Sequence, residues 1–120
     1  MSFNFTNETP IFLQIIEHIK SQIITREYLP NQKIPSVREL SLIYEVNPNT
    51  VQKALLELEN MGLIYTERTN GKFVTNNEAT IQKHREQTIK ALVDSFYNNA
   101  KKLGVTKEEV LEILNNKESL

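Results

Sequence analysis

Residues Pro35 to Gly62, "PSVRELSLIYEVNPNTVQKALLELENMG", decide the fold because they contain two helix-start signals in close succession. Ser36 and Glu39 form a capping box, in which each side chain accepts a hydrogen bond from the backbone N–H of the other residue. Apolar residues such as Leu40 then recur at helical spacing. This half of the stretch therefore predicts a short helix that ends near Glu45.

A second helix is predicted to begin only a few residues later, because Asn47-Pro48 combines a capping residue with a proline at the first helical position. With about 100° of rotation per residue, its apolar face lies opposite Asn49 and Lys53. Thr50 and Gln52 flank these two polar residues. The apolar face consists of Val51, Ala54, Leu55 and Leu58. The polar start of this helix should thus face outward, where it can contact another molecule.

The flanking segments complete the pattern of a winged helix-turn-helix. An apolar stripe after Thr9-Pro10 predicts a helix from about Pro10 to Arg26, with Thr9 as its N-cap. After Gly62, β-prone residues predict strands over 63–68 and 72–75, joined at Asn70-Gly71 by a type I′ turn. Two strands alone are marginal, so the hairpin should pack on the helices. We expect this domain to span residues 1–77.

Residues 78–120 predict a tail of two amphipathic helices. Asn77 caps the first, which runs to about Leu103, and a capping box at Thr106 and Glu109 starts the second. Their apolar stripe would pack either within one chain or between two chains, and the size of the patch favours two chains. The fold class is therefore mainly α with a small β-hairpin: a winged helix-turn-helix followed by a two-helix C-terminal dimerisation tail. The predicted dimerisation residues are Ile89, Leu92, Val93, Phe96, Ala100, Leu103, Val110 and Leu114.

The polar residues of the second helix have the chemistry of DNA recognition. In a helix-turn-helix this helix enters the major groove and presents its first residues to base edges. Asn49 and Gln52 can pair bidentately with adenine, and Lys53 can contact guanine or a phosphate. In the alternative, purely structural reading, Asn47 and Thr50 only cap and solvate the helix.

Basic residues outside this helix extend the hypothesis. Arg38 lies in the first turn after the first capping residue, Ser36, while Arg68 and Lys72 lie at the tip of the predicted hairpin. All three could contact the DNA backbone or an adjacent groove. Alternatively, Arg38 balances Glu39 or Glu45, and the hairpin charges only discourage edge pairing.

Composition excludes several other classes. With 14 Lys and Arg against 15 Asp and Glu, the net charge is −1, so bulk charge does not indicate a nucleic-acid binder. There is no cysteine, and His18, on a helix flank, and His84, on an exposed part of the long tail helix, are isolated. We therefore expect no metal site and no cofactor. Without a glycine-rich phosphate loop or an activated nucleophile, no enzymatic activity is expected.

The ends and the hydropathy of the chain bear on its location. The start lacks a signal peptide, and no stretch approaches the ~18–20 apolar residues of a membrane span. A chain without cysteine also fits a reducing compartment. We expect a cytoplasmic protein with no membrane partner.

Residues 28–74, "YLPNQKIPSVRELSLIYEVNPNTVQKALLELENMGLIYTERTNGKFV", closely resemble the DNA-binding domain of GntR-type bacterial transcription regulators. The shared landmarks are P-S-x-R-E-L, N-T-V-x-x-A-L-x-x-L-E and a G-x-F-V wing. The resemblance spans about residues 10–75. The short two-helix tail is similar in architecture to the YtrA-like subfamily, whose members are small regulators often located beside ABC-transporter genes.

The resemblance implies roles for individual positions. Arg38 corresponds to a DNA-contacting arginine of the family, and Asn70 and Gly71 correspond to wing residues that approach the minor groove. Pro48 and Gln52 stand where larger basic residues are common in the family, so the base preference is not transferred. The predicted DNA-binding set is Ser36, Arg38, Pro48, Asn49, Thr50, Gln52, Lys53, Arg68, Asn70, Gly71 and Lys72.

The resemblance also implies a two-fold dimer on an inverted-repeat operator, and symmetry supports this because one recognition helix reads few base pairs. We expect a sequence-specific regulator, a repressor that occludes promoter DNA, with an ABC-transporter operon as a candidate target. The alternative is a winged-helix protein–protein interaction module without sequence-specific DNA binding. A small-molecule effector is left open, since a tail of this size has little room for a pocket of the usual ~300 Å³ or more.

Overall fold

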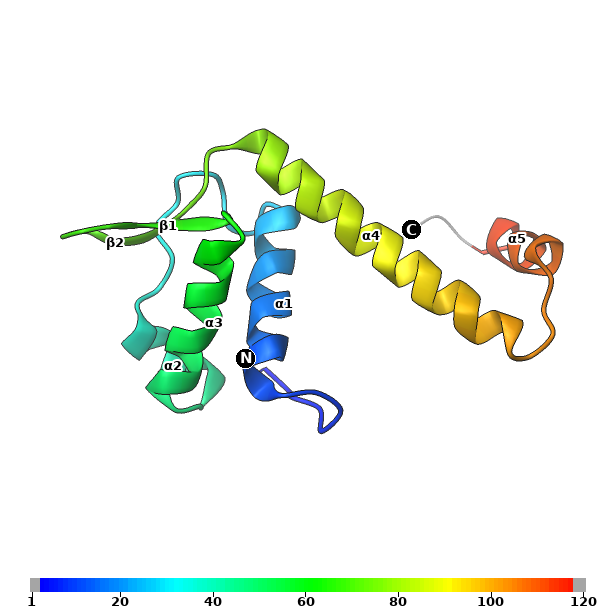
Figure 1. Cartoon of the computed structure of the whole chain (residues 1–120), viewed down its shortest axis with the longest axis horizontal. Helices are drawn as coiled ribbons and strands as arrows, with labels where there is room; N and C mark the ends of the chain where they lie inside the picture. The colour runs from blue at the N-terminus through cyan, green and yellow to red at the C-terminus, as the bar shows by residue number, and fades with distance from the viewer. Residues whose placement is uncertain (1–2, 118–120) are drawn as a thin grey trace. The chain divides into compact units, whose positions relative to one another are not determined.

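The computed structural model describes residues 3–117, which form five helices and a two-stranded antiparallel sheet (Figure 1). Contacts divide the chain after His84, inside α4, into two compact units, which we call the N-terminal and the C-terminal unit. The sequence-predicted boundary after Asn77 lies earlier, directly before the start of α4. The elements are α1 (Ile11–Ile24), α2 (Val37–Tyr44), α3 (Pro48–Asn60), β1 (Ile64–Glu67), β2 (Gly71–Val74), α4 (Glu78–Lys101) and α5 (Lys107–Asn115).

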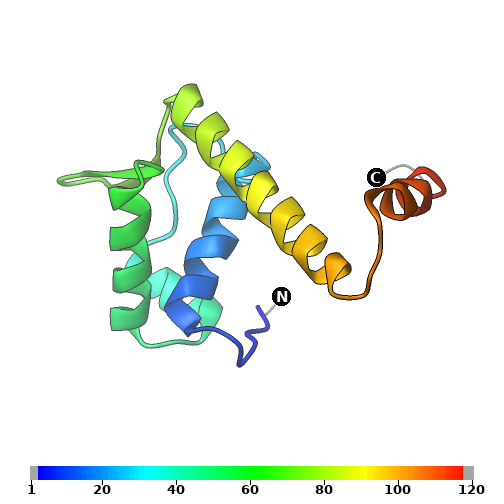
Figure 2. The ribbon, with the colours of Figure 1, turned by 45° about the vertical axis from the view of Figure 1, so that its right-hand side comes forward.

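The core of the N-terminal unit lies between α1 and α3, which run side by side, with α2 packed on α3 (Figures 1 and 2). Each helix contributes one apolar stripe at helical spacing. The predicted inward face of α3 is confirmed, because all four of its residues are fully buried. The main residues of this core are Ile15, Ile19, Ile23, Leu40, Tyr44, Val51, Ala54, Leu55 and Leu58.

Both predicted helix starts in the decisive stretch are confirmed. The Ser36 hydroxyl accepts a hydrogen bond from the Glu39 N–H (3.1 Å), and the Glu39 carboxylate accepts one from the Ser36 N–H (3.0 Å). Helix α2 ends at Glu45, which has a left-handed φ of 57°. The Asn47 side chain then accepts a hydrogen bond from the Asn49 N–H at 2.8 Å and caps α3. These local bonds set the tight turn between the two helices.

The start of α1 differs from the prediction. Pro10, not Thr9, is the N-cap, and no side chain accepts a hydrogen bond from the first turn. Gln14 instead ties down the preceding chain: its amide donates to the carbonyls of Thr6 (2.9 Å) and Thr9 (2.8 Å). The Thr9 carbonyl is thus held by a side chain from inside the helix.

The prediction of a type I′ turn at Asn70-Gly71 is wrong, although the hairpin itself is confirmed. Glu67 pairs with Gly71, so residues 68–70 lie between the paired positions. A type I′ turn has only two loop residues, both with positive φ. Here Gly71 has a φ of 108°, whereas Asn70 does not have a positive φ, and the Asn70 N–H donates to the Glu67 carbonyl at 3.1 Å. The Asn70 side chain also donates to the Glu67 carboxylate at 3.1 Å.

A segment before α2 supports the hairpin as a third, strand-like partner. The Asn31 N–H donates to the Val74 carbonyl, and the Val74 N–H donates to the Gln32 carbonyl, both at 2.9 Å. Lys33 also forms a β-bridge with Phe73. Sequence patterns did not indicate this pairing. It explains how a hairpin that is marginal alone is held on the helices.

The first turns of α4 belong to the N-terminal unit. Ile81 is 2% exposed, and the Arg26 guanidinium forms an ion pair with the Glu78 carboxylate. The expectation that His84 lies on an exposed part of its helix is wrong: it is half-buried, with Nε2 3.0 Å from the Met61 carbonyl oxygen. Because a carbonyl only accepts, Nε2 carries the hydrogen. Through this contact and the burial of Ile81, the first turns of α4 pack against the rest of the N-terminal unit.

The C-terminal unit consists of the rest of α4 and α5. The predicted capping box is confirmed: the Thr106 hydroxyl accepts from the Glu109 N–H at 3.2 Å, and the Glu109 carboxylate accepts from the Thr106 N–H at 3.1 Å. Gly104, with a φ of 73°, follows the end of α4. Within residues 3–117, no helix is both long and apolar enough to cross a membrane.

Replacing Ile81 by alanine should destabilise the N-terminal unit by about 2–5 kcal/mol, because it removes a fully packed side chain. Urea unfolding of the full chain measures the change. Ile43→Ala is the matched control, since Ile43 is 50% exposed and its loss should cost far less. Equal effects of the two substitutions would show that α4 does not complete this core.

Candidate nucleic-acid interface

The first turns of α3 present their polar side chains outward, as predicted. Asn49, Gln52 and Lys53 are exposed, as is Pro48, and Thr50 is half-buried. Within the described part of the chain, the side chains of Asn49 and Gln52 make no hydrogen bond. Their amide donors and acceptors are therefore available to an external partner. The DNA-binding hypothesis requires such an exposed polar surface at the start of α3.

Lys53 is exposed but has a partner in another helix. Its ammonium lies 3.9 Å from the centroid of the Phe12 ring in α1, a cation–π geometry. Sequence reasoning did not single out Phe12, which lies in the apolar stripe after Thr9-Pro10. No sequence signal could have linked the two residues, since their contact depends on the packing of α1 against α3.

The start of α2 lies next in the chain before α3 and carries Ser36 and Arg38, both exposed. The Arg38 side chain forms neither an ion pair nor a hydrogen bond within residues 3–117, so the alternative in which it balances a glutamate is not observed. Glu39 is instead engaged by Ser36, whose backbone and hydroxyl hydrogen bonds lower the pKa of the Glu39 carboxyl. The Arg38 guanidinium is left free at the surface.

The hairpin brings Arg68, Asn70 and Gly71 to an exposed turn that projects from the helices (Figures 1 and 2). Lys72, predicted to lie at the hairpin tip, is engaged by other residues of the protein. Its ammonium donates to the Thr66 hydroxyl at 2.7 Å and lies 3.7 Å from the Glu59 carboxylate of α3. Lys72 thus fastens the hairpin to α3. Of the two predicted basic residues of the hairpin, Arg68 is the one without an ion pair among the described residues.

Among residues 3–117, no group of three or more His, Cys, Asp or Glu side chains is placed to hold a metal ion. His18 lies with Nδ1 2.7 Å from the Tyr44 hydroxyl, and burial raises the pKa of Tyr44. His18 therefore links α1 to α2, as part of the packing.

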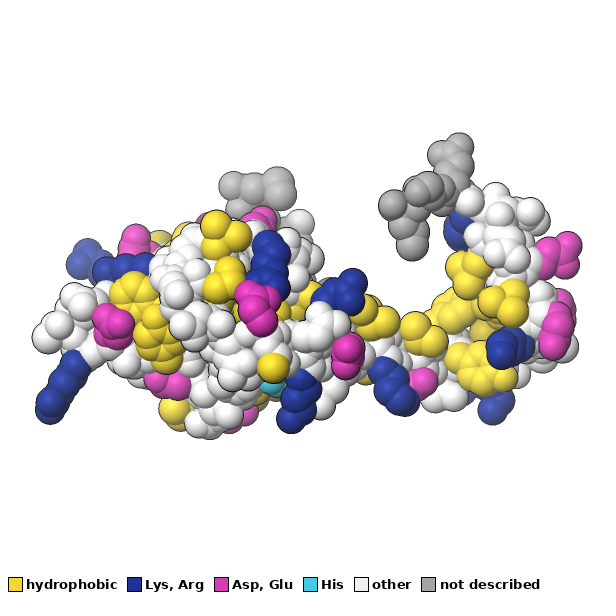
Figure 3. Space-filling view, turned by 90° about the horizontal axis from the view of Figure 1, so that it is seen from above, with side chains coloured by type: hydrophobic (Ala, Val, Ile, Leu, Met, Phe, Trp, Pro, Cys, Tyr) yellow, Lys and Arg dark blue, Asp and Glu magenta, His cyan; other side chains and the backbone are white. Residues whose placement is uncertain are grey.

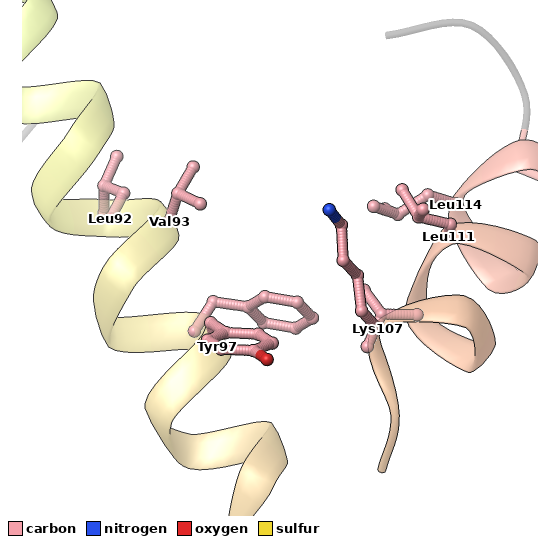
Figure 4. Close-up of a pocket in the computed structure, with 8 residues that line it drawn as sticks. Leu92, Val93, Tyr97, Lys107, Leu111 and Leu114 are labelled. Carbon is pink, nitrogen blue, oxygen red and sulfur yellow. The ribbon is translucent and has the colours of Figure 1, made fainter.

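The C-terminal unit contains an open apolar groove of about 660 Å³ between α4 and α5. In Figure 4, Leu92, Val93 and Tyr97 of α4 face Leu111 and Leu114 of α5, and the Lys107 side chain extends between them. The expectation that the tail has little room for a pocket is wrong, because α5 does not pack closely along α4. The groove is lined by Leu92, Val93, Phe96, Tyr97, Lys107, Val110, Leu111 and Leu114.

A helix-turn-helix with an outward polar second helix, an exposed arginine on the first helix that has no ion pair among residues 3–117, and a projecting wing define the class of winged-helix DNA-binding proteins. The comparisons with known proteins specify the family. The model of "Bacterial regulatory proteins, gntR family" matches residues 12–74. This chain belongs to the GntR family.

Curated relatives match along most of the chain. The uncharacterized HTH-type transcriptional regulator YhcF of Bacillus subtilis is 36% identical over 93% of both chains. The HTH-type transcriptional repressor YtrA of Bacillus subtilis is 38% identical over 76% of this chain and 75% of its own. Both matches reach into the tail, so the predicted YtrA-like resemblance is confirmed.

Solved structures extend the similarity to the fold. A GntR family transcriptional regulator from Listeria monocytogenes has a TM-score of 0.89 and 37% identity, covering 95% of this chain and 100% of that chain. The DNA-binding domain of AraR in complex with operator ORE1 has a TM-score of 0.55 and 33% identity, covering 62% of this chain and 93% of that chain. The protein is a DNA-binding transcription regulator of this family, whose members are not enzymes.

Replacing Ser36 by alanine removes the cap that orients the start of α2. We expect the pKa of Glu39 to rise only part of the way toward its ordinary value, because the backbone N–H of residue 36 still donates to the carboxylate. The protein should lose about 1 kcal/mol of stability at neutral pH. NMR titration of the Glu39 carboxyl and urea unfolding measure the two effects. Ser95→Ala, in an exposed part of α4, serves as the control.

The pH dependence of this loss has a defined sign. The pKa of Glu39 is lowered in the folded protein, so its stabilising contribution is present above the pKa of the unfolded chain. It is lost as the pH falls through the lowered folded value. The difference between Ser36→Ala and wild type should therefore shrink at acid pH, and a difference that grew there would contradict this account.

Proposed function

We propose that this protein is a homodimeric, cytoplasmic repressor that binds an inverted-repeat operator and occludes promoter DNA. The observation that carries the proposal is the exposed start of α3, where the side chains of Asn49 and Gln52 make no hydrogen bond within residues 3–117, together with the exposed Arg38, which has no ion pair among these residues. The names of relatives agree with it: YtrA is named a repressor, and the AraR domain is described in complex with an operator. The YtrA-like resemblance extends the proposal to an ABC-transporter operon as the regulated target.

In this proposal the interface residues divide by chemistry. Asn49 and Gln52 read base edges in the major groove, with Pro48 and Thr50 shaping the approach. Ser36 and Arg38 at the start of α2 contact the phosphate backbone. These assignments follow the exposed positions of the side chains on α2 and α3.

The wing is assigned to the minor groove and its backbone. Gly71 supports a close approach because it has a φ of 108° and no side chain. A Cβ there would also lie 3.0 Å from the Lys33 side chain. Arg68 and Asn70 occupy the same exposed turn, while Lys72 contributes by holding the hairpin on α3.

Dimerisation is assigned to the C-terminal unit. Helix α5 contains no buried residue, and the one buried residue of α4, Ile81, lies in the N-terminal unit. Leu92 is 67% and Leu103 is 82% exposed, and Figure 3 shows hydrophobic side chains gathered over this part of the chain. A helix as short as α5 that buries no residue is unstable alone. A second copy that covers the groove would bury this surface, whereas a small-molecule effector would cover only part of it.

Arg38→Ala and Asn49→Ala should both weaken binding to the operator, with different signatures. Loss of a phosphate contact at Arg38 should weaken binding to all duplexes and lower the salt slope by about one per subunit. Loss of a base contact at Asn49 should cost about 1–3 kcal/mol on the operator alone. Fluorescence anisotropy with a duplex recovered by selection, and with a scrambled duplex, measures both.

These binding measurements need a check on folding and a clear contrary result. Circular dichroism should show unchanged helix content in both variants. If wild-type protein bound the selected and scrambled duplexes equally and without salt dependence, the proposal would fail in favour of a protein-interaction module.

Phe96→Glu should convert the dimer to monomer, because it places a charge in the apolar surface of the C-terminal unit. Sedimentation velocity measures the change, and operator affinity should fall with it. Asn98→Glu adds the same charge to an exposed position that does not line the groove, and should leave the dimer intact.

A truncation provides an independent test of the same assignment. Ending the chain after His84 keeps Ile81 and the contacts of the N-terminal unit. This fragment should be folded and monomeric. A fragment that still dimerised would remove the C-terminal unit from the interface.

A further inference from the structure

Lys53 stands apart from the other exposed polar residues of α3 because a second helix holds its charged end. The ammonium lies 3.9 Å from the centroid of the Phe12 ring. Phe12 is half-buried and packs against the core, so neighbouring side chains restrict the position of its ring. A cation at this distance from an aromatic ring is attracted to its face. The direction of the Lys53 side chain is therefore set by α1.

The contact leaves the charge of Lys53 available. Glu57, one turn further along α3, is spaced for an ion pair with Lys53, but no such pair forms within residues 3–117. An ammonium group has three N–H donors, and the ring face does not neutralise its charge. Lys53 thus presents a full positive charge whose position is restricted by an uncharged partner.

The side of α3 on which this charge lies indicates what it contacts. In a helix-turn-helix the second helix occupies the major groove, while flanking elements lie against the backbone at the groove wall. Within residues 3–117, the exposed side chains of Asn49 and Gln52 have no hydrogen-bond partner, whereas the ammonium of Lys53 lies over the Phe12 ring of α1. A cation held over a neighbouring helix is better placed for a phosphate than for a base edge.

We propose that Phe12 is a positioning residue for DNA binding: it holds the Lys53 ammonium against the phosphate backbone and keeps it away from base edges. This inference rests on the proposed function. It divides the polar surface of α3 into residues that contact bases, Asn49 and Gln52, and a residue that contacts a phosphate, Lys53. Lys53 then supplies affinity that depends on salt and not on sequence.

Binding of the full-length protein to a selected duplex, and to a scrambled duplex of equal length, tests this division over a series of salt concentrations. Lys53→Ala should weaken binding about eightfold per subunit at 0.1 M salt, equally on both duplexes, and lower the salt slope by about one per subunit. Phe12→Leu keeps an apolar side chain but removes the ring. It should weaken binding about two- to fivefold.

Two further variants separate positioning from general packing. Phe12→Tyr retains the ring and should bind like wild type. The double variant Phe12→Leu with Lys53→Ala should bind no more weakly than Lys53→Ala alone, because Phe12 acts through Lys53. Lys83→Ala, an exposed lysine of α4, is the charge control and should leave the salt slope unchanged. Thermal unfolding of each variant shows whether folding is preserved.

The outcomes distinguish this inference from the proposed function. A loss confined to the selected duplex, with an unchanged salt slope, would make Lys53 a base contact and overturn the inference. So would additive losses in the double variant, or normal binding by Phe12→Leu. If Arg38→Ala and Asn49→Ala also left binding unchanged, the proposed function itself would fail.

Discussion

The structure depends on the burial of one face of α3 against α1. Val51, Leu55 and Leu58 are completely buried, and the isoleucines of α1 meet them from the other side. Because helical geometry places the remaining residues on the opposite surface, this burial forces Asn49 and Gln52 outward. Burial of the apolar face of α3 thus also determines the orientation of its polar face. Any change that rotated α3 would hide the polar residues and expose the apolar ones.

Because the chain is nearly neutral, DNA binding depends on where its basic side chains lie and on which of them form internal ion pairs. Several basic side chains are already committed within the protein: Arg26 to Glu78, and Lys72 to Glu59. Arg38 has no acidic partner within residues 3–117. The ammonium of Lys53 contacts an aromatic ring, that of Phe12. The proposed interface therefore uses cations that internal ion pairs do not neutralise.

The two units of the chain differ in how their apolar residues are satisfied. The N-terminal unit buries its apolar stripes inside one chain and extends its core into α4 through Ile81. The C-terminal unit leaves its stripe on the surface, with an open groove along α5. A helix that begins in one unit and ends in the other provides a covalent link between the proposed DNA-binding and dimerisation surfaces.

Local sequence determined which segments form helices, the starts of α2 and α3, and the buried face of α3. Capping at Ser36 and Asn47 and the apolar spacing of α3 act between residues a few positions apart, so they can be read without a structure. The resemblance to one family added the identity of the domain. The positions of Asn49 and Gln52 on the outer face follow from the same periodicity.

Tertiary structure decided everything that joins distant parts of the chain. The contacts of Lys53 with Phe12 and of Lys72 with Glu59 arise only when separate elements pack together. The same holds for the burial of His84 at the end of α3 and for the strand-like pairing before α2. Local patterns carry no record of such contacts, because they depend on which surfaces meet after the helices have formed.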